Sequence, residues 1–545
     1  MLRRTLSGVL FLAAVSGCSS GKSQAPAASQ PTTDWNAEAK KLLTGPDWYR
    51  HAIFYEVYVR SFQDSNGDGI GDFKGLTSRL DYLKDLGVDA IWLMPMYPTP
   101  FKDSGYDISD YEAINPDYGT MADFDEFLKQ AHQRGIRVLA DLVLNHTSDQ
   151  HPWFLESRKD KTNSKADWYI WSDTPSSPDI GCGTDNPKFG KSAWQLDPVR
   201  GQYYFHRFYP EQPDLNYRNP EVVKATLDVA RYWLDKGVDG FRCDVIAFLY
   251  ESANGCDFLP ETQDYIKKLR ALLDQYPHRA MVAESTDFNT SGQYFGNGQN
   301  MFHMAFDFAY GYFWQFPFAG GNAGAIKTAF QNAQDTYPPG AQDALVIGSH
   351  DVSRAYTTAT GDETRARRAA LIQMTMPGSP FIYYGEELSL RSGKQQLVDS
   401  RDYARTPMLW DAGPGYGFTS GKPWIAFGED ADKTNLAAEK SDPGSMYSWY
   451  QKLLALRRGR AVWGTGQLRL LEPDTGALLA YVRQDSRFEY LIAVNMTSDS
   501  QKATIADAKL PASGKLVWGA GKLGVHGDSA NVELPGSEDA IFQIK

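Results

Sequence analysis

Three carboxylates, each at the end of an apolar run, have the clearest potential for chemistry in this sequence. Asp244 ends the run GFRCD, Glu284 follows the run MVA, and Asp351 follows the run LVIGSH. One acidic residue at the end of a strand is commonly structural, but three together suit acid–base work. Two carboxyl groups that flank a glycosidic bond are what glycoside hydrolysis requires, and a pair about 5 Å apart would retain the anomeric configuration.

The neighbours of these carboxylates indicate different roles for them. Residues two apart on a strand point to the same face, so Arg242 should lie beside Asp244. A guanidinium beside a carboxylate keeps it ionised, which suits a nucleophile. The apolar residues before Glu284 should exclude water and raise its pKa, which suits a general acid. His146 and His350 end two further strand-like runs and complete the set.

An alternation of strand and helix patterns fills most of the chain and must position these residues. Apolar runs predict strands at residues 52–59, 90–95, 137–143, 239–245, 279–284, 303–310, 344–350 and 380–384. Periodic apolar stripes predict helices at residues 76–87, 121–134, 220–236, 261–275, 362–376 and 443–458. Eight strand-like units in roughly 400 residues predict an α/β fold, the (β/α)8 TIM barrel, whose catalytic residues lie at the carboxyl ends of the strands.

Three segments fall outside this alternation. Residues 145–216 are rich in Pro, Gly, Asp and Trp and predict an inserted subdomain B, so the barrel should comprise residues 48–144 and 217–460. Residues 461–545 contain short β-like runs separated by turns, which predicts a C-terminal all-β sandwich. Residues 18–47 are expected to form a flexible tether, because large apolar residues are nearly absent between residues 19 and 33.

The first residues have the features of a bacterial lipoprotein signal. Residues 1–17 contain two arginines and an apolar run too short to span a bilayer, and they precede Cys18. Lipidation of Cys18 would anchor the chain in the bacterial cell envelope, on the periplasmic or outer-membrane side. An ordinary secretory signal is the alternative. No later segment is apolar enough to span a membrane, and the net charge of −12 disfavours nucleic acid as a partner.

The other cysteines leave one question open. Cys243 alternates with Arg242 and Asp244 along its strand, so it should point into apolar packing. Cys182 and Cys256 lie in loop-like segments and could pair in an oxidising compartment. Two buried free thiols are the alternative.

At four of these sites the sequence resembles the α-amylase family, glycoside hydrolase family 13. The motifs are DLVLNH at 141–146, GFRCD at 240–244, VAE at 282–284 and SHD at 349–351. The resemblance implies that Asp244 is the nucleophile and that Glu284 is the acid and then the base. It implies that Asp351 binds sugar hydroxyls and favours the distorted transition state.

The same resemblance assigns residues to substrate binding. His146 and His350 match the pair that bonds hydroxyls of the sugar at the cleaved bond, and Arg242 is counted with them. Tyr106, in the motif GYD, matches the aromatic platform under that sugar. Ser349 departs from the family, which usually has Asn there, but a small polar residue should keep the turn.

Two segments narrow the resemblance to the branch of oligo-1,6-glucosidases, α-glucosidases and trehalose synthases. They are QPDLN at 212–216 and SRDYARTP at 400–407. In that branch an Asp–Arg pair closes the pocket behind the terminal glucose and makes the enzyme exo-acting. The matching residues are Asp103 and Arg405, with Arg401 as the second choice, and a surface salt bridge is the alternative. Val245 resembles members that prefer α-1,6 bonds.

A glycine-rich acidic loop follows the first predicted strand. Its oxygen-bearing residues imitate the start of an EF-hand, but Gly75 stands where the bidentate Glu would be, so the loop is not one. The branch resemblance implies a structural Ca²⁺ here, without an organic cofactor. The implied ligands are Asp64, Asn66, Asp68, the Ile70 carbonyl and Asp72. A hydrated acidic turn is the alternative.

Together these features predict a glycoside hydrolase that cleaves α-linked gluco-oligosaccharides from their non-reducing ends through a covalent glucosyl-enzyme. An endo-acting α-amylase would need an open cleft instead. A glucosyltransferase or trehalose synthase would pass the glucosyl group to a sugar rather than to water. A non-catalytic glucan-binding lipoprotein is disfavoured by the three intact carboxylates.

Overall fold

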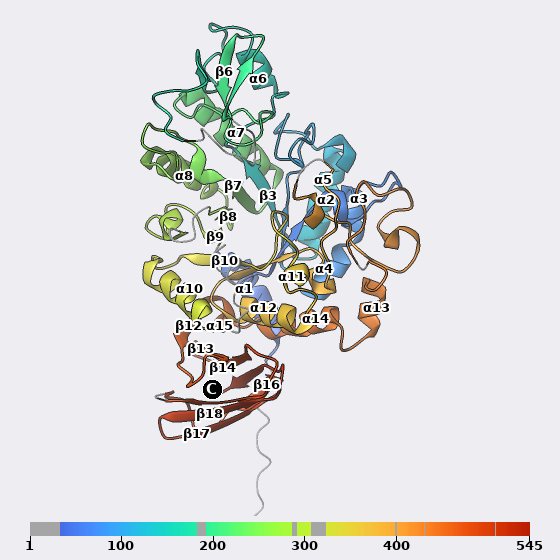
Figure 1. Ribbon diagram of the computed structural model, residues 1–545, viewed down its shortest axis with the longest axis vertical. Helices are drawn as coiled ribbons and strands as arrows, with labels where there is room; N and C mark the ends of the chain where they lie inside the picture. Colours follow the sequence, from blue (N-terminus) through green and yellow to red (C-terminus); the bar gives the residue numbers. More distant parts are fainter. Residues whose placement is uncertain are drawn as a thin grey trace, which may run out of the picture. The chain divides into compact units, whose positions relative to one another are not determined.

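The computed structural model describes residues 33–182, 192–285, 291–306, 323–397, 400–429, 431–506 and 508–545 (Figure 1). The predicted signal sequence and its Cys18 lie outside these residues. Residues Trp35–Lys545 form one compact unit. Within the described ranges, no helix has both the length and the apolar character needed to cross a membrane.

The centre of this unit is a closed barrel of parallel strands, which confirms the predicted α/β class. Within the described residues, the strands follow the order β1-β11-β10-β9-β8-β7-β3-β2 around the barrel. They are β1 (Phe54–Val57), β2 (Ala90–Leu93), β3 (Arg137–Val143), β7 (Gly240–Asp244), β8 (Ala280–Ala283), β9 (Met304–Phe306), β10 (Gln342–Val346) and β11 (Ser379–Tyr383). Each of these strands overlaps a predicted strand, although β10 begins two residues before its prediction and ends four residues before it.

Helices cover the outside of the barrel. The longer ones are α5 (Met121–Gln133), α7 (Pro220–Lys236), α8 (Pro260–Leu273), α10 (Ala323–Thr336), α12 (Glu363–Thr375) and α14 (Met446–Arg457). Shorter helices are α2 (Val59–Phe62), α3 (Phe73–Ser78), α4 (Leu80–Leu86), α11 (Ala355–Thr358), α13 (Leu436–Ser441) and α15 (Ala461–Thr465). The helix α7 matches its prediction to the residue, because Asn219 caps its first turn and Gly237 ends it with a positive φ of 102°.

Side chains fill the interior of the barrel. Phe54 of β1 and Phe381 of β11 stack with ring centroids 4.2 Å apart, and the Trp92 ring packs against Phe381 and Phe306. All four residues are buried. The barrel is therefore a packed core rather than a pore, and chemistry is confined to its open end.

The first described helix corrects one prediction. The tether was expected to continue to residue 47, but Trp35–Thr44 form helix α1. The Trp35 ring lies 5.7 Å from the ring of Phe488, and the Arg460 guanidinium lies 3.9 Å from the Trp35 centroid. A tryptophan that packs in this way anchors the helix to the folded unit, so any flexible tether ends before Trp35.

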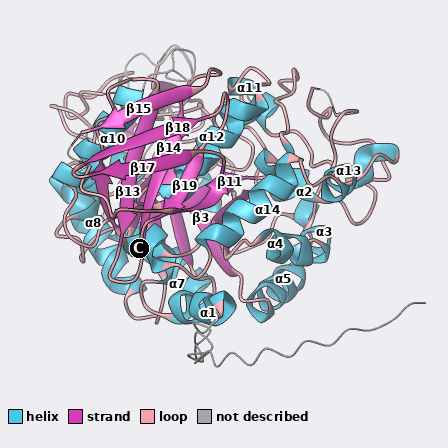
Figure 2. Cartoon of the chain, turned by 90° about the horizontal axis from the view of Figure 1, so that it is seen from below, coloured by secondary structure: helices cyan, strands magenta, loops and turns pink. Residues whose placement is uncertain are grey.

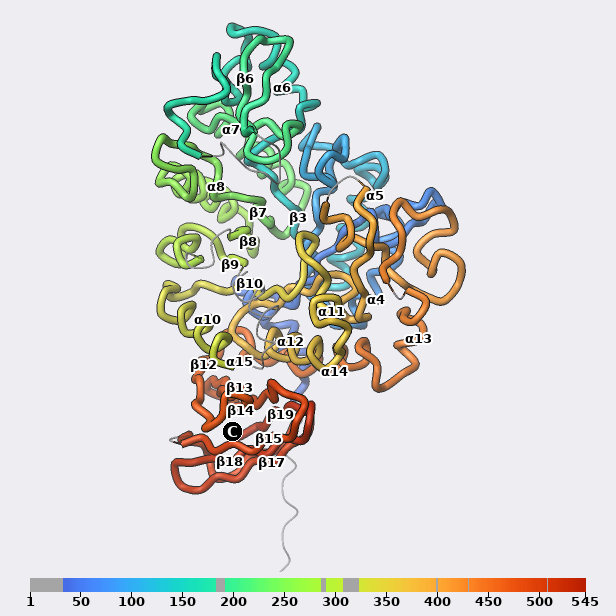
Figure 3. Tube along the Cα trace, viewed as in Figure 1, coloured from blue at the N-terminus to red at the C-terminus, as the bar shows by residue number. Residues whose placement is uncertain are grey.

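The region between β3 and β7 forms the predicted insertion, which Figure 3 traces along the chain. It contains α6 (Pro152–Ser157) and a small antiparallel sheet of β4 (Trp171–Ser172), β6 (Gln202–Phe205) and β5 (Trp194–Asp197). A disulfide joins Cys182 of the insertion to Cys256 of the loop after β7, with the Cα atoms 6.0 Å apart. Cys243 is a buried free cysteine, as its strand pattern predicted.

The last segment forms two antiparallel sheets, whose strands are seen together in Figure 2. One has the order β12-β13-β14-β19-β16 and the other β15-β18-β17. Their bounds are β12 (Gln467–Leu470), β13 (Leu478–Gln484), β14 (Glu489–Asn495), β15 (Gln501–Ile505), β16 (Lys515–Gly519), β17 (Lys522–His526), β18 (Ser529–Leu534) and β19 (Ala540–Gln543). The buried guanidinium of Arg483 donates to the carbonyl oxygens of Thr375 and Val462, which fixes β13 to the barrel helices.

Candidate active site

One arginine holds two of the three predicted catalytic carboxylates. Asp244 is the last residue of β7, and Glu284 comes directly after β8. Between them, Arg242 Nη1 lies 2.6 Å from Asp244 Oδ1, and Arg242 Nη2 lies 2.8 Å from Glu284 Oε2. The two carboxylates therefore face one another across a single guanidinium group at the carboxyl ends of adjacent strands.

Arg242 also contacts the carboxylate of Asp141, which is not one of the three predicted catalytic carboxylates. Arg242 Nη1 lies 2.9 Å from Asp141 Oδ1, and the Trp92 indole donates to Asp141 Oδ2 at 3.2 Å. Asp141 is fully buried in β3, whereas the side chains of Asp244 and Glu284 keep 8% and 13% of their surface exposed. A substrate in the barrel mouth could reach the latter two only, so Asp141 serves to orient Arg242.

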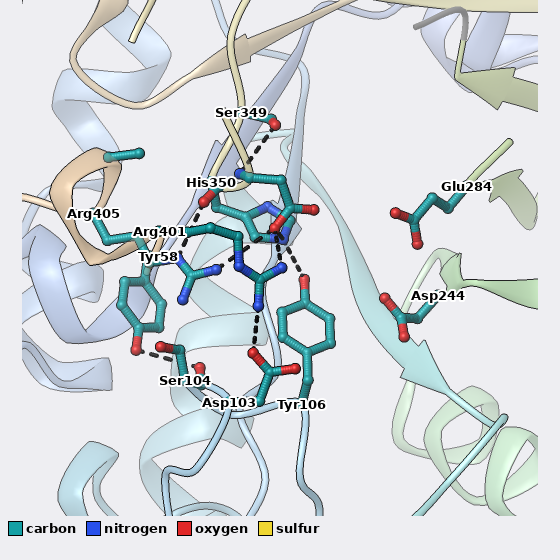
Figure 4. A network of polar contacts seen from close by, with 12 residues as sticks. Tyr58, Asp103, Ser104, Tyr106, Asp244, Glu284, Ser349, His350, Arg401 and Arg405 are labelled. Carbon is teal, nitrogen blue, oxygen red and sulfur yellow. Dashed lines mark hydrogen bonds and ion pairs between the residues drawn. The ribbon is translucent and has the colours of Figure 1, made fainter. Parts of the chain in front are cut away.

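The wall opposite this pair carries a second charged cluster (Figure 4). Arg401 Nη1 lies 2.6 Å from Asp351 Oδ1, and Arg401 Nη2 forms an ion pair with Asp103. In Figure 4, Asp244 and Glu284 point across the site towards Arg401 and Tyr106. The structure thus brings Arg401, the second choice for the partner of Asp103, together with five other predicted site residues. These are Asp103, Tyr106, Asp244, Glu284 and Asp351.

Arg405 was the first choice for that partner, and this prediction is wrong. Arg405 is completely buried, its Nε donates to the backbone oxygen of His350 at 3.1 Å, and its Nη2 lies 3.6 Å from Asp351. The turn at Asp402–Ala404 separates the two arginines and turns Arg405 inward. Arg405 therefore supports the backbone that presents Asp351, while Arg401 faces Asp103.

His350 and Tyr106 belong to one hydrogen-bonded chain. Tyr106 Oη lies 2.7 Å from His350 Nε2, and the two rings stack at 5.4 Å with an angle of 14° between them. His350 Nδ1 hydrogen-bonds the buried carboxylate of Glu56 on β1. Glu56 was not predicted as a site residue, although a carboxylate inside an apolar strand was a visible signal.

Gln212 is a second residue that the sequence analysis missed. Its amide donates to Asp103 Oδ2 at 2.9 Å and lies 3.2 Å from His146 Nε2. The His146 ring also approaches the backbone oxygen of Tyr106 at 3.2 Å. The insertion, which contains Gln212, therefore holds Asp103 in place for Arg401. Gln212 stood at the start of a recognised motif but was not assigned a role.

The electrostatics of the site separate the carboxylates into two kinds. Burial raises the pKa of Glu284 to about 7 against the effect of Arg242, as predicted for a general acid. Burial and the neighbouring Asp141 also raise the pKa of Asp244 to about 7, although Arg242 lowers it. The predicted low pKa of Asp244 is not found, because one guanidinium serves three carboxylates.

Asp351 behaves in the opposite way. Burial raises its pKa, but the neighbouring His350, Arg401 and Arg405 outweigh that effect and hold the pKa well below its ordinary value. Asp351 is therefore ionised throughout the range in which Asp244 and Glu284 titrate, which suits a permanent acceptor for sugar hydroxyls.

The residue after the nucleophile has an unusual backbone. Val245 has φ 35° and ψ 37°, a left-handed conformation that a β-branched residue rarely adopts. Its amide donates to Glu284 Oε2 at 2.8 Å. Strain of this kind persists where the surrounding structure imposes it. Here it turns a backbone donor towards the predicted acid.

The acidic loop after β1 uses its own backbone as a hydrogen-bond donor. Asp64 accepts from the amides of Asn66, Gly67 and Gly69, and Asp72 caps α3 by accepting from the Gly75 amide. Among the described residues, no three acidic, histidine or cysteine side chains are grouped as ready metal ligands. The all-oxygen donor set still has the chemistry that Ca²⁺ takes. A bound ion would have to displace some of these hydrogen bonds.

A search of protein families identifies residues 56–465 as an "Alpha amylase, catalytic domain". The matched segment contains all the site residues described above. The matched segment begins within β1, includes the rest of the barrel and the insertion, and ends before the C-terminal sheets.

Individual proteins of known name resemble the chain over most of its length. It is 35% identical to an oligo-1,6-glucosidase of Heyndrickxia coagulans, over 83% of this chain and 93% of that protein. It is 37% identical to a trehalose synthase/amylase of Mycolicibacterium smegmatis, over 84% of each. The crystal structure of a trehalulose synthase from Pseudomonas mesoacidophila MX-45 has a TM-score of 0.81 and 31% identity, over 91% of this chain and 99% of that one. Mutants of that enzyme have been crystallised with sucrose and with isomaltulose.

Proposed function

This chain belongs to the α-amylase family of glycoside hydrolases, and from that premise we propose that it is a retaining, exo-acting α-glucosidase of short malto- and isomalto-oligosaccharides. The observation that carries the exo-acting part is the Asp103–Arg401–Asp351 cluster opposite the catalytic pair. Two charged groups linked by one arginine form a wall, against which a terminal sugar would rest.

In the proposed reaction, Asp244 attacks the anomeric carbon while Glu284 gives its proton to the glycosidic oxygen. The bond to the leaving sugar breaks, and a β-glucosyl ester with Asp244 forms. Glu284, now ionised, takes a proton from water, whose oxygen attacks the same carbon and releases Asp244 and an α-configured glucose. The grip of one guanidinium on both carboxylates supports the short separation that retention requires.

The other residues of the site would hold the sugar rather than react with it. Asp351 and Asp103 would offer acceptors, and Arg401 and His146 would offer donors, to the hydroxyls of a terminal glucose. Charge-assisted hydrogen bonds of this type are stronger than neutral ones. Tyr106 would supply the apolar ring beneath the sugar, because its ring is fixed by His350.

A second candidate function is transfer of the glucosyl group to a sugar. It is favoured by the similarity to a trehalose synthase/amylase and to a trehalulose synthase. Incubation of the protein with maltose, isomaltose, trehalose, sucrose and starch, each alone, separates the candidates by product. Glucose from maltose or isomaltose supports hydrolysis, an isomeric disaccharide supports transfer, and internal fragments of starch would contradict an exo-acting enzyme.

Arg401→Ala should lower kcat/KM for maltose and isomaltose by about a hundredfold, because it breaks a buried charge pair with Asp103. Starch should lose less than about tenfold, because a long chain gains most of its binding energy beyond the terminal sugar. Arg365→Ala, which removes only an exposed ion pair with Asp362, is the matched control and should change neither rate. Equal losses on both substrates would contradict the pocket wall.

The pH dependence of kcat/KM should be bell-shaped, with both limbs near the pKa of about 7 that burial gives Asp244 and Glu284. Towards low pH, Asp244 gains a proton and ceases to be a nucleophile. Towards high pH, Glu284 loses the proton that it must donate. The two groups interact across Arg242, so the apparent pKa values of the two limbs belong to the pair and not to either residue alone. An aryl α-glucoside assayed from pH 4 to 9 measures the profile, and a flat alkaline side would contradict the role of Glu284.

We also propose that the loop of Asp64, Asn66, Asp68, Ile70 and Asp72 binds Ca²⁺ for stability. Removal of Ca²⁺ with EDTA should lower the melting temperature by at least about 2 °C, and added Ca²⁺ should restore it. Asp68→Asn is the variant to test, since the Asp68 carboxylate is on the exposed side of the loop. An unchanged melting temperature in EDTA would leave the loop as a self-supporting turn.

A further inference from the structure

A cavity of about 700 Å³ lies at the end of the barrel opposite the catalytic carboxylates. Arg137, Asp239 and Arg279, which line it, stand at or just before the first residues of β3, β7 and β8. The catalytic residues instead lie at the opposite ends of β7 and β8, since Asp244 ends β7 and Glu284 follows β8. Helix α1, the end of α5 and residues from α4 and α14 complete the lining.

Three of the cations around this cavity have no carboxylate partner. Lys40 of α1, Lys84 of α4 and Arg458, which caps α14, all line it. In the described part of the chain, no carboxylate oxygen lies within 4.0 Å of their charged atoms, and Arg458 Nε is buried without a hydrogen-bond acceptor. We refer to them as the Lys40–Lys84–Arg458 triad.

The other basic groups of the cavity have carboxylate partners, although Arg137 and Arg279 share the single carboxylate of Asp239. Arg137 Nη1 lies 2.9 Å from Asp239 Oδ1, and His132 Nε2 lies 2.7 Å from Asp239 Oδ2. Arg134 pairs with Asp81 at 2.6 Å. The buried carboxyl group of Asp89 interacts electrostatically with Lys84 and Arg458 and offsets part of their charge, but it does not line the cavity.

The triad is therefore a local excess of positive charge on a chain whose net charge is −12. Burial and the charge of Arg458 lower the pKa of Lys84, as expected where like charges are held together. Three elements far apart in sequence bring these charges to one concave surface. Concave surfaces lined by one sign of charge concentrate ligands of the opposite sign.

We propose that the Lys40–Lys84–Arg458 triad binds the phosphate group of an anionic phospholipid at the membrane surface. The position of α1 favours a lipid over a free anion. Trp35 begins α1, and the predicted lipid anchor at Cys18 precedes it by a short segment that can reach at most about 60 Å. Basic residues near an anionic bilayer are attracted to it over about one Debye length.

The proposed lipid contact would fix the orientation of the enzyme at the membrane. A membrane contact at the amino ends of the strands would turn the carboxyl ends, and thus Asp244 and Glu284, away from the bilayer. The active site would then face the compartment from which oligosaccharides arrive, and it would not be covered by lipid.

Co-sedimentation with vesicles tests the proposal. The protein used begins at residue 33, since Trp35–Lys545 contain the whole compact unit, and it therefore lacks the predicted anchor. Vesicles of phosphatidylcholine with about 30% phosphatidylglycerol should bind it, and vesicles of phosphatidylcholine alone should not. The double variant Lys40→Glu/Arg458→Glu should weaken binding at least about tenfold, and 0.5 M salt should weaken wild-type binding similarly.

The matched control is Lys515→Glu/Lys522→Glu, which changes the net charge equally on the C-terminal sheets, where both lysines are exposed. It should bind vesicles like the wild type, and both double variants should hydrolyse an aryl α-glucoside at the wild-type rate, which shows that they fold. Equal binding to the two vesicle types, or equal weakening by both double variants, would overturn the proposal. Calorimetric binding of inorganic phosphate without binding to vesicles would overturn the lipid as its ligand.

Discussion

Asp244→Asn is expected to lower kcat at least about ten-thousandfold on every α-glucoside, because the amide cannot form the glucosyl ester. The fold should persist. Burial and Asp141 both disfavour the charge of Asp244 in the folded protein, so a neutral side chain of the same shape should not lower the melting temperature. The measurement is steady-state kinetics with a thermal melt on the same sample.

Asp228→Asn is the matched control for this variant. Asp228 lies on the exposed side of α7 in an ion pair with Lys224, far from any strand end, so its replacement should leave kcat unchanged. Residual activity of Asp244→Asn within a hundredfold of the wild type would refute the nucleophile assignment. A fall in the melting temperature would show instead that the negative charge of Asp244 stabilises Arg242.

Glu284→Gln should have the second largest effect, a loss of about a thousandfold on maltose. The glutamine cannot donate a proton to the glycosidic oxygen or take one from water. The loss should be much smaller in the first step on an aryl glucoside whose leaving group needs no proton. In that first step, the alkaline limb of the pH profile should disappear. If the alkaline limb persisted, it would be due to the titration of a group other than Glu284.

Azide distinguishes the two carboxylates by the product that it forms. With Glu284→Ala, azide should attack the glucosyl ester of Asp244 in place of water and yield the α-glucosyl azide. With Asp244→Ala, azide should attack the substrate directly from the vacated side and yield the β-glucosyl azide. The opposite stereochemistry in either variant would exchange the roles proposed for Asp244 and Glu284.

The parts of the fold that were predictable have short-range causes. A run of apolar residues that ends in a carboxylate specifies both a buried strand and its exposed end, so Asp244 and Glu284 could be placed at the barrel mouth from sequence alone. The helix α7 has a capping Asn219 and a terminal Gly237 within a few residues of its ends, which is why its limits were predicted correctly.

The parts that were not predictable depend on contacts between distant segments. Arg401 and Arg405 lie four residues apart in one motif, and only the turn between them decides which guanidinium reaches Asp103, a residue almost 300 positions earlier. Gln212 acquires its role in the same way, from an insertion that folds back over the barrel. Helix α1 was missed because its stripe of apolar residues is short, and it is the packing of Trp35 against Phe488 that fixes it.

The Cys182–Cys256 disulfide limits how the part of the insertion that contains Gln212 can unfold. It links positions 74 residues apart, one in the insertion and one in the loop that follows the nucleophile strand. A disulfide that closes a loop of that length lowers the conformational entropy of the unfolded chain. This stabilises the folded state by on the order of 4 kcal/mol. The segment that contains Gln212 should therefore not unfold locally by itself. While the disulfide is oxidised, this segment should therefore resist proteolysis through local unfolding as well as the strand β7 does.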